Sequence, residues 1–225
     1  MAGTAIFDMD RTLTRSGTWS RFMFKVNRKR PLFYLRLPAL LAHAIAYKLG
    51  FFSRLSVKEH GLKTMTWADR HDLEKAADLF AEEELRHGLR RQTMAVLERH
   101  RLAGDKLVMA TAAAELVARP IGEKLGMAVV ICTDLEWSEN DRLTGKLASA
   151  NCYGAAKLDR ILEADKAHDF AKPTYGYSDH VSDLPFLQWV DEGFAVNPSR
   201  GLAQVADKVG LRIEDWESEN MGEQS

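Results

Sequence analysis

Residues 4–9 form a short apolar segment that stops at two acids, Asp8 and Asp10. A short apolar run of this kind is typical of a buried strand in a parallel sheet. A carboxylate at the end of such a strand is costly in free energy unless a counter-charge, a hydrogen-bond donor or a metal ion meets it. The segment therefore restricts the chain to folds in which other polar groups converge on the end of this strand.

Four more short apolar segments follow, at residues 106–111, 127–133, 173–178 and 193–197. Helix-like segments lie between them, notably at 112–126 and 154–169. Strands that alternate with helices predict an α/β fold, in which a Rossmann-like parallel sheet carries helices on both faces. Residues 135–149 alternate apolar and polar positions around a polar centre, which predicts a hairpin that projects from the sheet.

Residues 15–100 show no strand pattern, so we expect an all-helical insertion after the first strand. The predicted domains are an α/β core of residues 1–14 and 101–225 and a helical domain of residues 15–100. Thr66, with Asp69 three residues later, is expected to cap a helix in this insertion. Residues 15–63 contain eleven lysines and arginines and a single acid, Glu59, for a net charge of +10. This charge indicates either an anionic partner or a solvated basic face.

The cysteine content bears on the compartment. The chain has only two cysteines, Cys132 and Cys152, and their spacing suits neither a metal site nor a disulfide framework. The first strand begins so early that no room is left before it for a signal peptide. We therefore expect a cytoplasmic protein.

Two further acids, Asp179 and Asp183, stand four residues apart directly after the segment 173–178. Ligands of parallel α/β sheets bind beyond the carboxyl ends of the strands, so these acids should gather with Asp8 and Asp10. Four carboxylates would repel one another there unless they shared a hard divalent cation, and ligation by oxygen alone favours Mg²⁺. On its own, the Asp-x-Asp-x-Thr pattern is weak evidence, since an aspartate at a strand end also caps turns.

A hydroxyl and an ammonium are predicted near the same place. Thr111 ends the segment 106–111, and Lys157 stands at the start of the helical segment 154–169. Together with a free helix N-terminus that we expect after Thr111, they supply what phosphate oxygens bind. The sequence thus predicts carboxylates, a cation and a phosphate site at one edge of the sheet.

In order and setting, these residues resemble the motifs of the haloacid dehalogenase superfamily of phosphatases, specifically subfamily IB, which includes phosphoserine phosphatase. The resemblance covers the sheet domain and most of the chain, and the insertion resembles the helical cap of this branch. It implies a Mg²⁺-dependent hydrolase that takes a small-molecule phosphomonoester. The residues that carry it are Asp8-Met9-Asp10-Arg11-Thr12, Thr111, Lys157, and Asp179 with Asp183.

The resemblance implies a role for each motif residue. Asp8 would attack phosphorus to form an aspartyl-phosphate, and Asp10 would act as general acid and then as general base. An acid two residues after the nucleophile favours a phosphatase over a dehalogenase or a transport ATPase; a phosphotransferase or mutase shares both acids and stays an alternative. The implied phosphate-binding residues are Thr111, Ala112 and Lys157. The implied metal ligands are Asp8, Asp10 through its main-chain carbonyl, Asp179 and Asp183, the last of which either ligates through water or orients Lys157.

Some positions depart from the family pattern or leave their role open. Arg11 stands where a small residue is common, so it either points into the cap or adds positive charge near the substrate. Tyr177 replaces a common glycine, and the three alanines after Thr111 weaken an assignment to phosphoserine. Trp19 either lines the substrate pocket or anchors the core of the cap.

Residues 30–52 are nearly all apolar after a basic start, but Arg36, His43 and Lys48 interrupt them. This pattern predicts one or two amphipathic helices rather than a transmembrane segment, with a bend at Pro38. They either pack within the cap or meet an anionic membrane surface peripherally, in which case a lipid phosphate such as phosphatidylglycerophosphate becomes a candidate substrate. The tryptophans lack the interleaved basic residues of a nucleic-acid platform, so no nucleic acid is expected as a partner.

Overall fold

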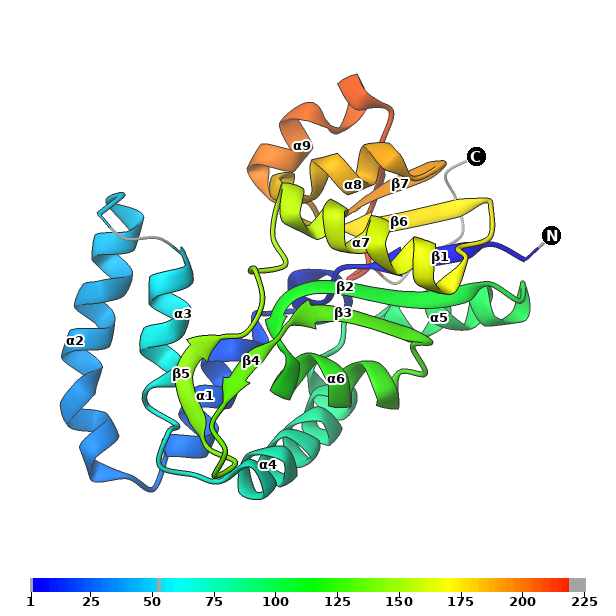
Figure 1. The fold of residues 1–225 in the computed structure, drawn as a ribbon. Helices are drawn as coiled ribbons and strands as arrows, with labels where there is room; N and C mark the ends of the chain where they lie inside the picture. Colours follow the sequence, from blue (N-terminus) through cyan, green and yellow to red (C-terminus); the bar gives the residue numbers. More distant parts are fainter. Residues whose placement is uncertain (1, 52–53, 219–225) are drawn as a thin grey trace.

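The computed structural model describes residues 2–51 and 54–218, in which a parallel sheet carries helices on both faces and a helical insertion extends beyond it (Figure 1). In chain order the elements are β1 (Thr4–Phe7), η1 (Met9–Leu13), α1 (Thr18–Asn27), α2 (Pro31–Lys48), α3 (Arg54–Leu62), α4 (Arg70–Glu83), η2 (Glu84–Gly88), α5 (Thr93–Leu102), β2 (Lys106–Ala114), α6 (Glu115–Lys124), β3 (Val129–Thr133), β4 (Leu135–Trp137), β5 (Leu143–Leu147), α7 (Ala155–His168), β6 (Thr174–Ser178), η3 (Val181–Asp183), α8 (Leu184–Trp189), β7 (Glu192–Val196), α9 (Arg200–Ala206), η4 (Asp207–Val209) and β8 (Arg212–Glu214).

The main sheet has six strands in the order β3-β2-β1-β6-β7-β8, and every pairing in it is parallel. Strand β1 lies in the interior, since Thr4 pairs with Lys106 of β2 on one side and with Thr174 of β6 on the other. This order confirms the predicted parallel sheet. It also places the carboxyl ends of β1, β2 and β6 next to one another.

The sheet separates two apolar cores, because successive residues of a strand point to opposite faces. Phe7 of β1 joins the core that contains residues of α5 and α6, whereas its neighbour Ile6 joins the core that contains residues of α7, α8 and α9. Both side chains are fully buried, and each such burial stabilises the fold by about 1.5–3 kcal/mol. Burial on both faces explains the continuous apolar runs of the sequence.

Helices α1 to α4 form most of the insertion between β1 and β2, and α2 and α3 stand side by side at its far end (Figure 1). Helix α5 instead packs against the sheet, where Arg99 Nη2 donates a hydrogen bond of 3.1 Å to the Tyr177 hydroxyl and His100 Nε2 lies 3.0 Å from it. This helix crosses the expected boundary at residue 100, and the division into domains stays a prediction. Tyr177 itself stacks on Phe7 and Phe194, with ring centroids 4.8 and 4.6 Å apart.

Strands β4 and β5 form the predicted hairpin, paired antiparallel with Trp137 opposite Leu143. The hairpin reaches the insertion, because the Arg70 amide donates to the Asp141 carbonyl at 2.8 Å. Gly145 of β5, at φ +87°, approaches the insertion so closely that a Cβ there would lie 2.8 Å from Lys63 Cγ. The hairpin therefore packs against one side of the insertion.

One local expectation in the insertion is wrong. The side chain of Asp69 caps α4 by accepting a 2.9 Å hydrogen bond from the Asp72 amide, whereas the Thr66 hydroxyl donates to the Lys63 carbonyl instead. Asp69 has the extended backbone (φ −79°, ψ 168°) that suits an N-cap residue. Helix α2 is a single helix that continues through Pro38, which agrees with the expectation of one or two helices here. Along the described residues, no helix has the length and apolar character needed to cross a bilayer.

Candidate active site

Asp8 follows the last residue of β1 and is buried. Its amide donates a 2.9 Å hydrogen bond to the Tyr177 carbonyl, so the chain stays tied to β6 as it leaves the strand. The next residues form the wide turn η1, in which Arg11 takes a left-handed conformation at φ +67°. This turn brings the Thr12 hydroxyl back to donate a 3.2 Å hydrogen bond to Asp8 Oδ2.

Asp179 follows β6, the neighbour of β1, and it lies beside Asp8 as the sequence predicts. The link between them is Thr12, whose hydroxyl donates to Asp8 and accepts a 3.0 Å hydrogen bond from the Asp179 amide. Burial raises the pKa of the Asp179 carboxyl, and the charge of Asp183 adds to this rise. Two strand ends that are far apart in the sequence thus present their acids together.

Lys157, in the first turn of α7, is buried between two carboxylates. Its Nζ donates to Asp8 Oδ1 at 2.8 Å and to Asp183 Oδ2 at 2.6 Å. The Ser178 hydroxyl also donates to Asp183 Oδ2, at 2.7 Å. The structure thus shows the contact that one of the two roles left open for Asp183, orientation of Lys157, requires.

The charges of this cluster are strongly coupled. Burial raises the pKa of the Asp8 carboxyl, and the Lys157 ammonium lowers it in part. Burial alone would lower the pKa of Lys157, but the Asp183 and Asp8 carboxylates raise it above its ordinary value and keep the ammonium charged. The lysine thus supplies a fixed positive charge beside the predicted nucleophile.

Asp10 occupies the other side of the turn and contacts the start of the insertion. Its Oδ1 accepts hydrogen bonds of 2.8 Å from both the amide and the hydroxyl of Thr18, the first residue of α1. Burial raises the pKa of the Asp10 carboxyl, although the bonds from Thr18 and the charge of Lys58 oppose the rise. A raised pKa and a fixed orientation suit a group that gives and takes a proton.

The segment around Thr111 differs from the expectation. Strand β2 continues through Ala114, and α6 begins only at Glu115, so Thr111 is not followed directly by a helix N-terminus. The extension keeps its pairing with β3 by a shift in register between Ala110 and Ala114. The Thr111 side chain is buried, and its hydroxyl accepts a 3.1 Å hydrogen bond from the Ala113 amide.

The sequence analysis did not single out Lys58, on α3 of the insertion. Its Nζ donates to the Ala112 carbonyl and, at 2.7 Å, to Asn151 Oδ1. The Thr133 hydroxyl donates to the same two acceptors, at 3.1 Å each. Lys58 therefore connects the insertion to the carboxyl end of β2, but nothing distinguishes it in the sequence from the other basic residues nearby.

The two residues with open roles lie at the edge of the site. Arg11 is exposed, and its positive charge opposes the raised pKa of Asp179, so it adds positive charge near the acids. Trp19 is half-buried and packs against the core within the insertion. It lies beside α3, where a Cβ on Gly61 would be 3.3 Å from Trp19 Nε1.

The donor set suits a hard cation. The described residues hold no cluster of three or more acidic, histidine or cysteine side chains arranged for a metal. The expected set is different, since it combines two carboxylates, Asp8 and Asp179, with the main-chain carbonyl of Asp10, and all of its donors are oxygens. Asp183 Oδ1 is buried and has no hydrogen-bond partner among the described groups, which is consistent with an additional polar ligand nearby.

Comparison with known proteins gives a family. The family model of haloacid dehalogenase-like hydrolases matches residues 5–188. The "Inhibition of morphological differentiation protein" of Streptomyces azureus is 34% identical over 128 residues, which are 56% of this chain and 45% of that protein. Protein CicA of Caulobacter vibrioides is 31% identical over 188 residues, which are 83% and 82% of the two chains. Histidinol-phosphatase of Neisseria meningitidis serogroup C is 26% identical over 236 residues, covering 95% of this chain and 98% of that protein.

The chain thus spans less than half the length of the Streptomyces relative and most of the length of the other two. Among solved structures, a protein of unknown function from Bordetella pertussis Tohama I has a TM-score of 0.84 and 26% identity, over 96% of this chain and 99% of that one. A substrate-bound phosphoserine phosphatase has a TM-score of 0.66 and 14% identity, over 98% and 95%. At that identity, the second similarity concerns the fold alone.

Proposed function

The chain belongs to the haloacid dehalogenase-like hydrolase family, and from this we propose that it is a Mg²⁺-dependent phosphatase that forms an aspartyl-phosphate on Asp8. One observation carries the proposal: Lys157 Nζ lies 2.8 Å from Asp8 in a buried site that Asp179 also borders. A buried carboxylate beside a fixed ammonium can act as a nucleophile toward an anionic phosphate, because the ammonium offsets the repulsion between them.

The proposed first step is attack of an Asp8 carboxylate oxygen on phosphorus. The bond from phosphorus to the ester oxygen breaks, and Asp10 gives its proton to the departing alkoxide. In the second step Asp10 takes a proton from water, the resulting hydroxide attacks phosphorus, and the acyl-phosphate bond breaks to restore Asp8. The products are an alcohol and inorganic phosphate.

The other residues of the site would bind and orient the phosphate. Lys157 and Thr111, with the backbone of Ala112, would contact its oxygens, while Asp183 holds Lys157 in place. The oxygens of Asp8, Asp10 and Asp179 would hold Mg²⁺, which when bound neutralises charge between the nucleophile and the phosphate. The helical insertion would act as a cap that closes over the substrate and excludes water.

Removal of divalent cations is expected to reduce release of phosphate from p-nitrophenyl phosphate to background, because the Lys157 ammonium is then left to offset the charge of four acids without Mg²⁺. Addition of Mg²⁺ after EDTA treatment should restore the activity, whereas addition of K⁺ at equal ionic strength should not. Full activity in the presence of excess EDTA would contradict the metal assignment. Transfer of phosphate to added acceptor alcohols, in place of release, would favour a phosphotransferase.

A second candidate is a lipid-phosphate phosphatase at a membrane surface. The observation that favours it is the exposed apolar side chains of α2 on the cap, of which Leu35 and Leu41 are 77% and 62% exposed. A screen that compares soluble esters, including phosphoserine and histidinol phosphate, with phosphatidylglycerophosphate in vesicles separates the two. Preference for any soluble ester by kcat/KM supports the first candidate, and preference for the lipid supports the second.

The proposed compartment is the cytoplasm. Both cysteines, Cys132 and Cys152, are buried and free, which suits a reducing environment. Contact of the cap with a membrane would be peripheral.

A further inference from the structure

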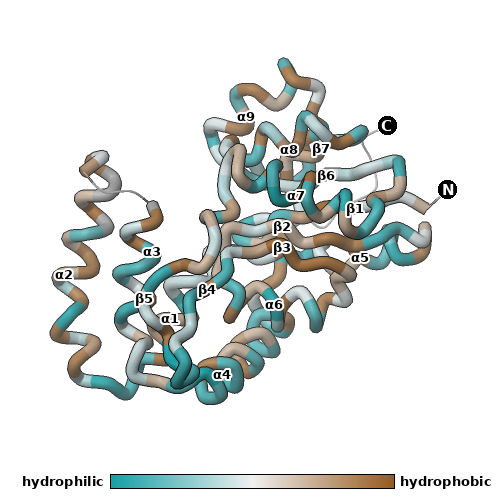
Figure 2. The backbone as a smooth tube through the Cα atoms, viewed as in Figure 1, coloured by the Kyte–Doolittle hydropathy of each residue, from teal (hydrophilic) through white to brown (hydrophobic). Residues whose placement is uncertain are grey.

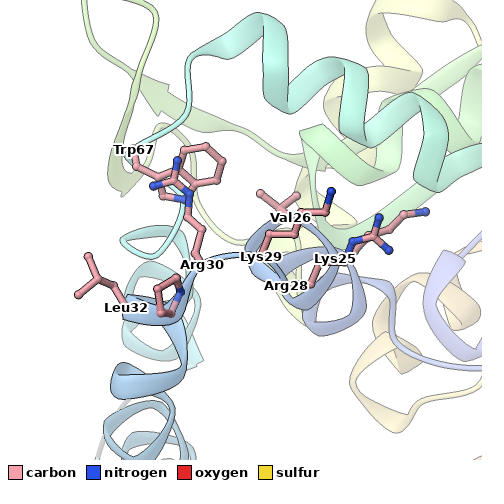
Figure 3. Close-up of a pocket in the computed structure, with 8 residues that line it drawn as sticks. Lys25, Val26, Arg28, Lys29, Arg30, Leu32 and Trp67 are labelled. Carbon is pink, nitrogen blue, oxygen red and sulfur yellow. The ribbon is translucent and has the colours of Figure 1, made fainter.

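A cationic pocket lies in the cap at the junction of α1 and α2 (Figure 3). It has a volume of about 620 Å³ and is lined by four basic residues, Lys25, Arg28, Lys29 and Arg30, with no acid among its lining residues. Figure 3 shows Arg30 lying across Trp67, and the guanidinium is 3.1 Å from the ring centroid. This stack holds one positive charge in place at the wall of the pocket.

The cationic surface continues on the other side of this stack. A second pocket of about 180 Å³ shares Arg30, Leu32 and Trp67 with the first and adds Arg36 and Lys63. Lys25 is paired with Glu83, and Arg28 and Lys29 are exposed. A cluster of this kind attracts an anionic group, and phosphate is among the anions that arginine and lysine bind.

An exposed apolar stripe adjoins the cluster. Helix α2 packs on α3 with one side, and near its start the buried Phe33 meets Phe24 of α1 edge to face. On another side, positions seven and four residues apart carry Tyr34, Leu41 and Ile45, which are 50%, 62% and 58% exposed. Figure 1 places α2 at the outer limit of the cap, and Figure 2 shows apolar residues along its length. Soluble monomers rarely expose a stripe of this length, so another surface is expected to cover it.

We propose that the cap docks on an anionic lipid bilayer, with α2 lying along the interface and a lipid headgroup phosphate in the pocket of Arg28, Lys29 and Arg30. A basic cluster beside an apolar helix face is the combination that binds such a surface. Leu32, at the start of the same helix, lines the pocket and is 68% exposed. A second copy of the chain would bring two such basic clusters together, which the repulsion of like charges opposes.

The test is flotation of the full chain with vesicles of phosphatidylcholine alone or of phosphatidylcholine with phosphatidylglycerol. Binding is expected only with the anionic lipid, and it should weaken as salt is added. The double variant R28Q/K29Q is expected to lower the partition coefficient about 5-fold for each charge removed. The variant L41Q/I45Q should lower the partition coefficient as well, because it removes apolar area from the side of the helix that would enter the bilayer.

Matched controls are K166Q/K208Q and L102Q, at exposed positions of α7, η4 and α5 outside the proposed surface. Neither should change the partition coefficient. None of these variants touches the catalytic residues, so turnover of a soluble aryl phosphate should remain at the parent level in all of them. Absence of vesicle binding would therefore leave the phosphatase proposal intact, and absence of phosphatase activity would leave the docking proposal intact.

Three results would overturn the docking proposal. One is equal binding to neutral and anionic vesicles, and another is unchanged binding of R28Q/K29Q. The third is a concentration-dependent dimer that L41Q/I45Q abolishes without any vesicle binding by the parent chain, as light scattering after size exclusion would detect. That result would assign the stripe to a second copy of the chain.

Discussion

Replacement of Asp8 by asparagine is expected to lower turnover of p-nitrophenyl phosphate by at least about 10³-fold, because an amide cannot attack phosphorus to form the covalent intermediate. The fold should survive this change. The asparagine carbonyl can still accept from Lys157, its amide nitrogen can donate to the Thr12 hydroxyl oxygen, and the 2.6 Å contact between Lys157 and Asp183 remains. The measurement is kcat with saturating substrate, alongside thermal unfolding.

The matched control is D207N, which makes the same chemical change at an exposed position of η4. It should leave kcat unchanged. In the parent protein, acid quenching during turnover should trap an acyl phosphate that hydroxylamine cleaves, on the peptide that contains Asp8. Undiminished kcat in D8N, or a trapped phosphate on another residue, would refute the assignment of the nucleophile.

Replacement of Lys157 by methionine is expected to damage both stability and activity. The side chain is 1% exposed and its Nζ contacts two carboxylates. Removal of one partner from a buried ion pair typically costs about 3–5 kcal/mol in the free energy of unfolding. Loss of a charge that faces the transition state typically costs about 10²–10³-fold in kcat. The measurements are denaturant unfolding and kcat.

The pH dependence of K157M should identify the cause of its instability. Burial already raises the pKa of Asp8 and the Lys157 ammonium lowers it, so loss of the lysine should raise this pKa further. The folded variant would then bind more protons than the unfolded chain, whose aspartate pKa is about 3.9. Its free energy of unfolding should consequently increase as the pH falls from 7 toward that value.

The double variant K157M/D183N keeps this prediction testable if K157M alone does not fold. Removal of the second carboxylate should recover part of the lost stability, because one uncompensated charge is removed, but it should not recover kcat. The exposed K166M, in the same helix, is the control and should behave like the parent. An unfolding free energy of K157M equal to that of the parent would contradict the proposed ion-pair network.

The strands of the interior could be predicted because burial on both faces gives continuous apolar runs. Edge strand β8 could not, since its three residues include a charge at each end and Arg212 and Ile213 are exposed. The helix expected directly after Thr111 was wrong because alanine suits the buried extension of β2 there, in spite of its helix propensity. At these alanines, pairing with β3 outweighs the helix propensity of the residue.

The candidate site was partly predictable for a geometric reason. Asp8 and Asp179 each follow a strand directly, and parallel strands end at the same edge of a sheet. A correct prediction of the sheet was therefore enough to place the two acids close together. The choice between two roles for Asp183 could not be made, since it depends on the position of Lys157 Nζ to within an ångström. Lys58 was missed because only the packing of α3 against the core selects it from the basic residues of the insertion.

The interior place of β1 has a consequence for the order in which the protein is built on the ribosome. Strand β1 takes its two neighbours from residues about one hundred and one hundred and seventy positions later in the chain, at Lys106 and Thr174. A nascent chain that ends before β6 leaves one side of β1 unpaired and lacks Asp179 and Asp183. The candidate site is therefore completed only after β6 has been synthesised, and forming contacts of such long sequence separation is intrinsically slow.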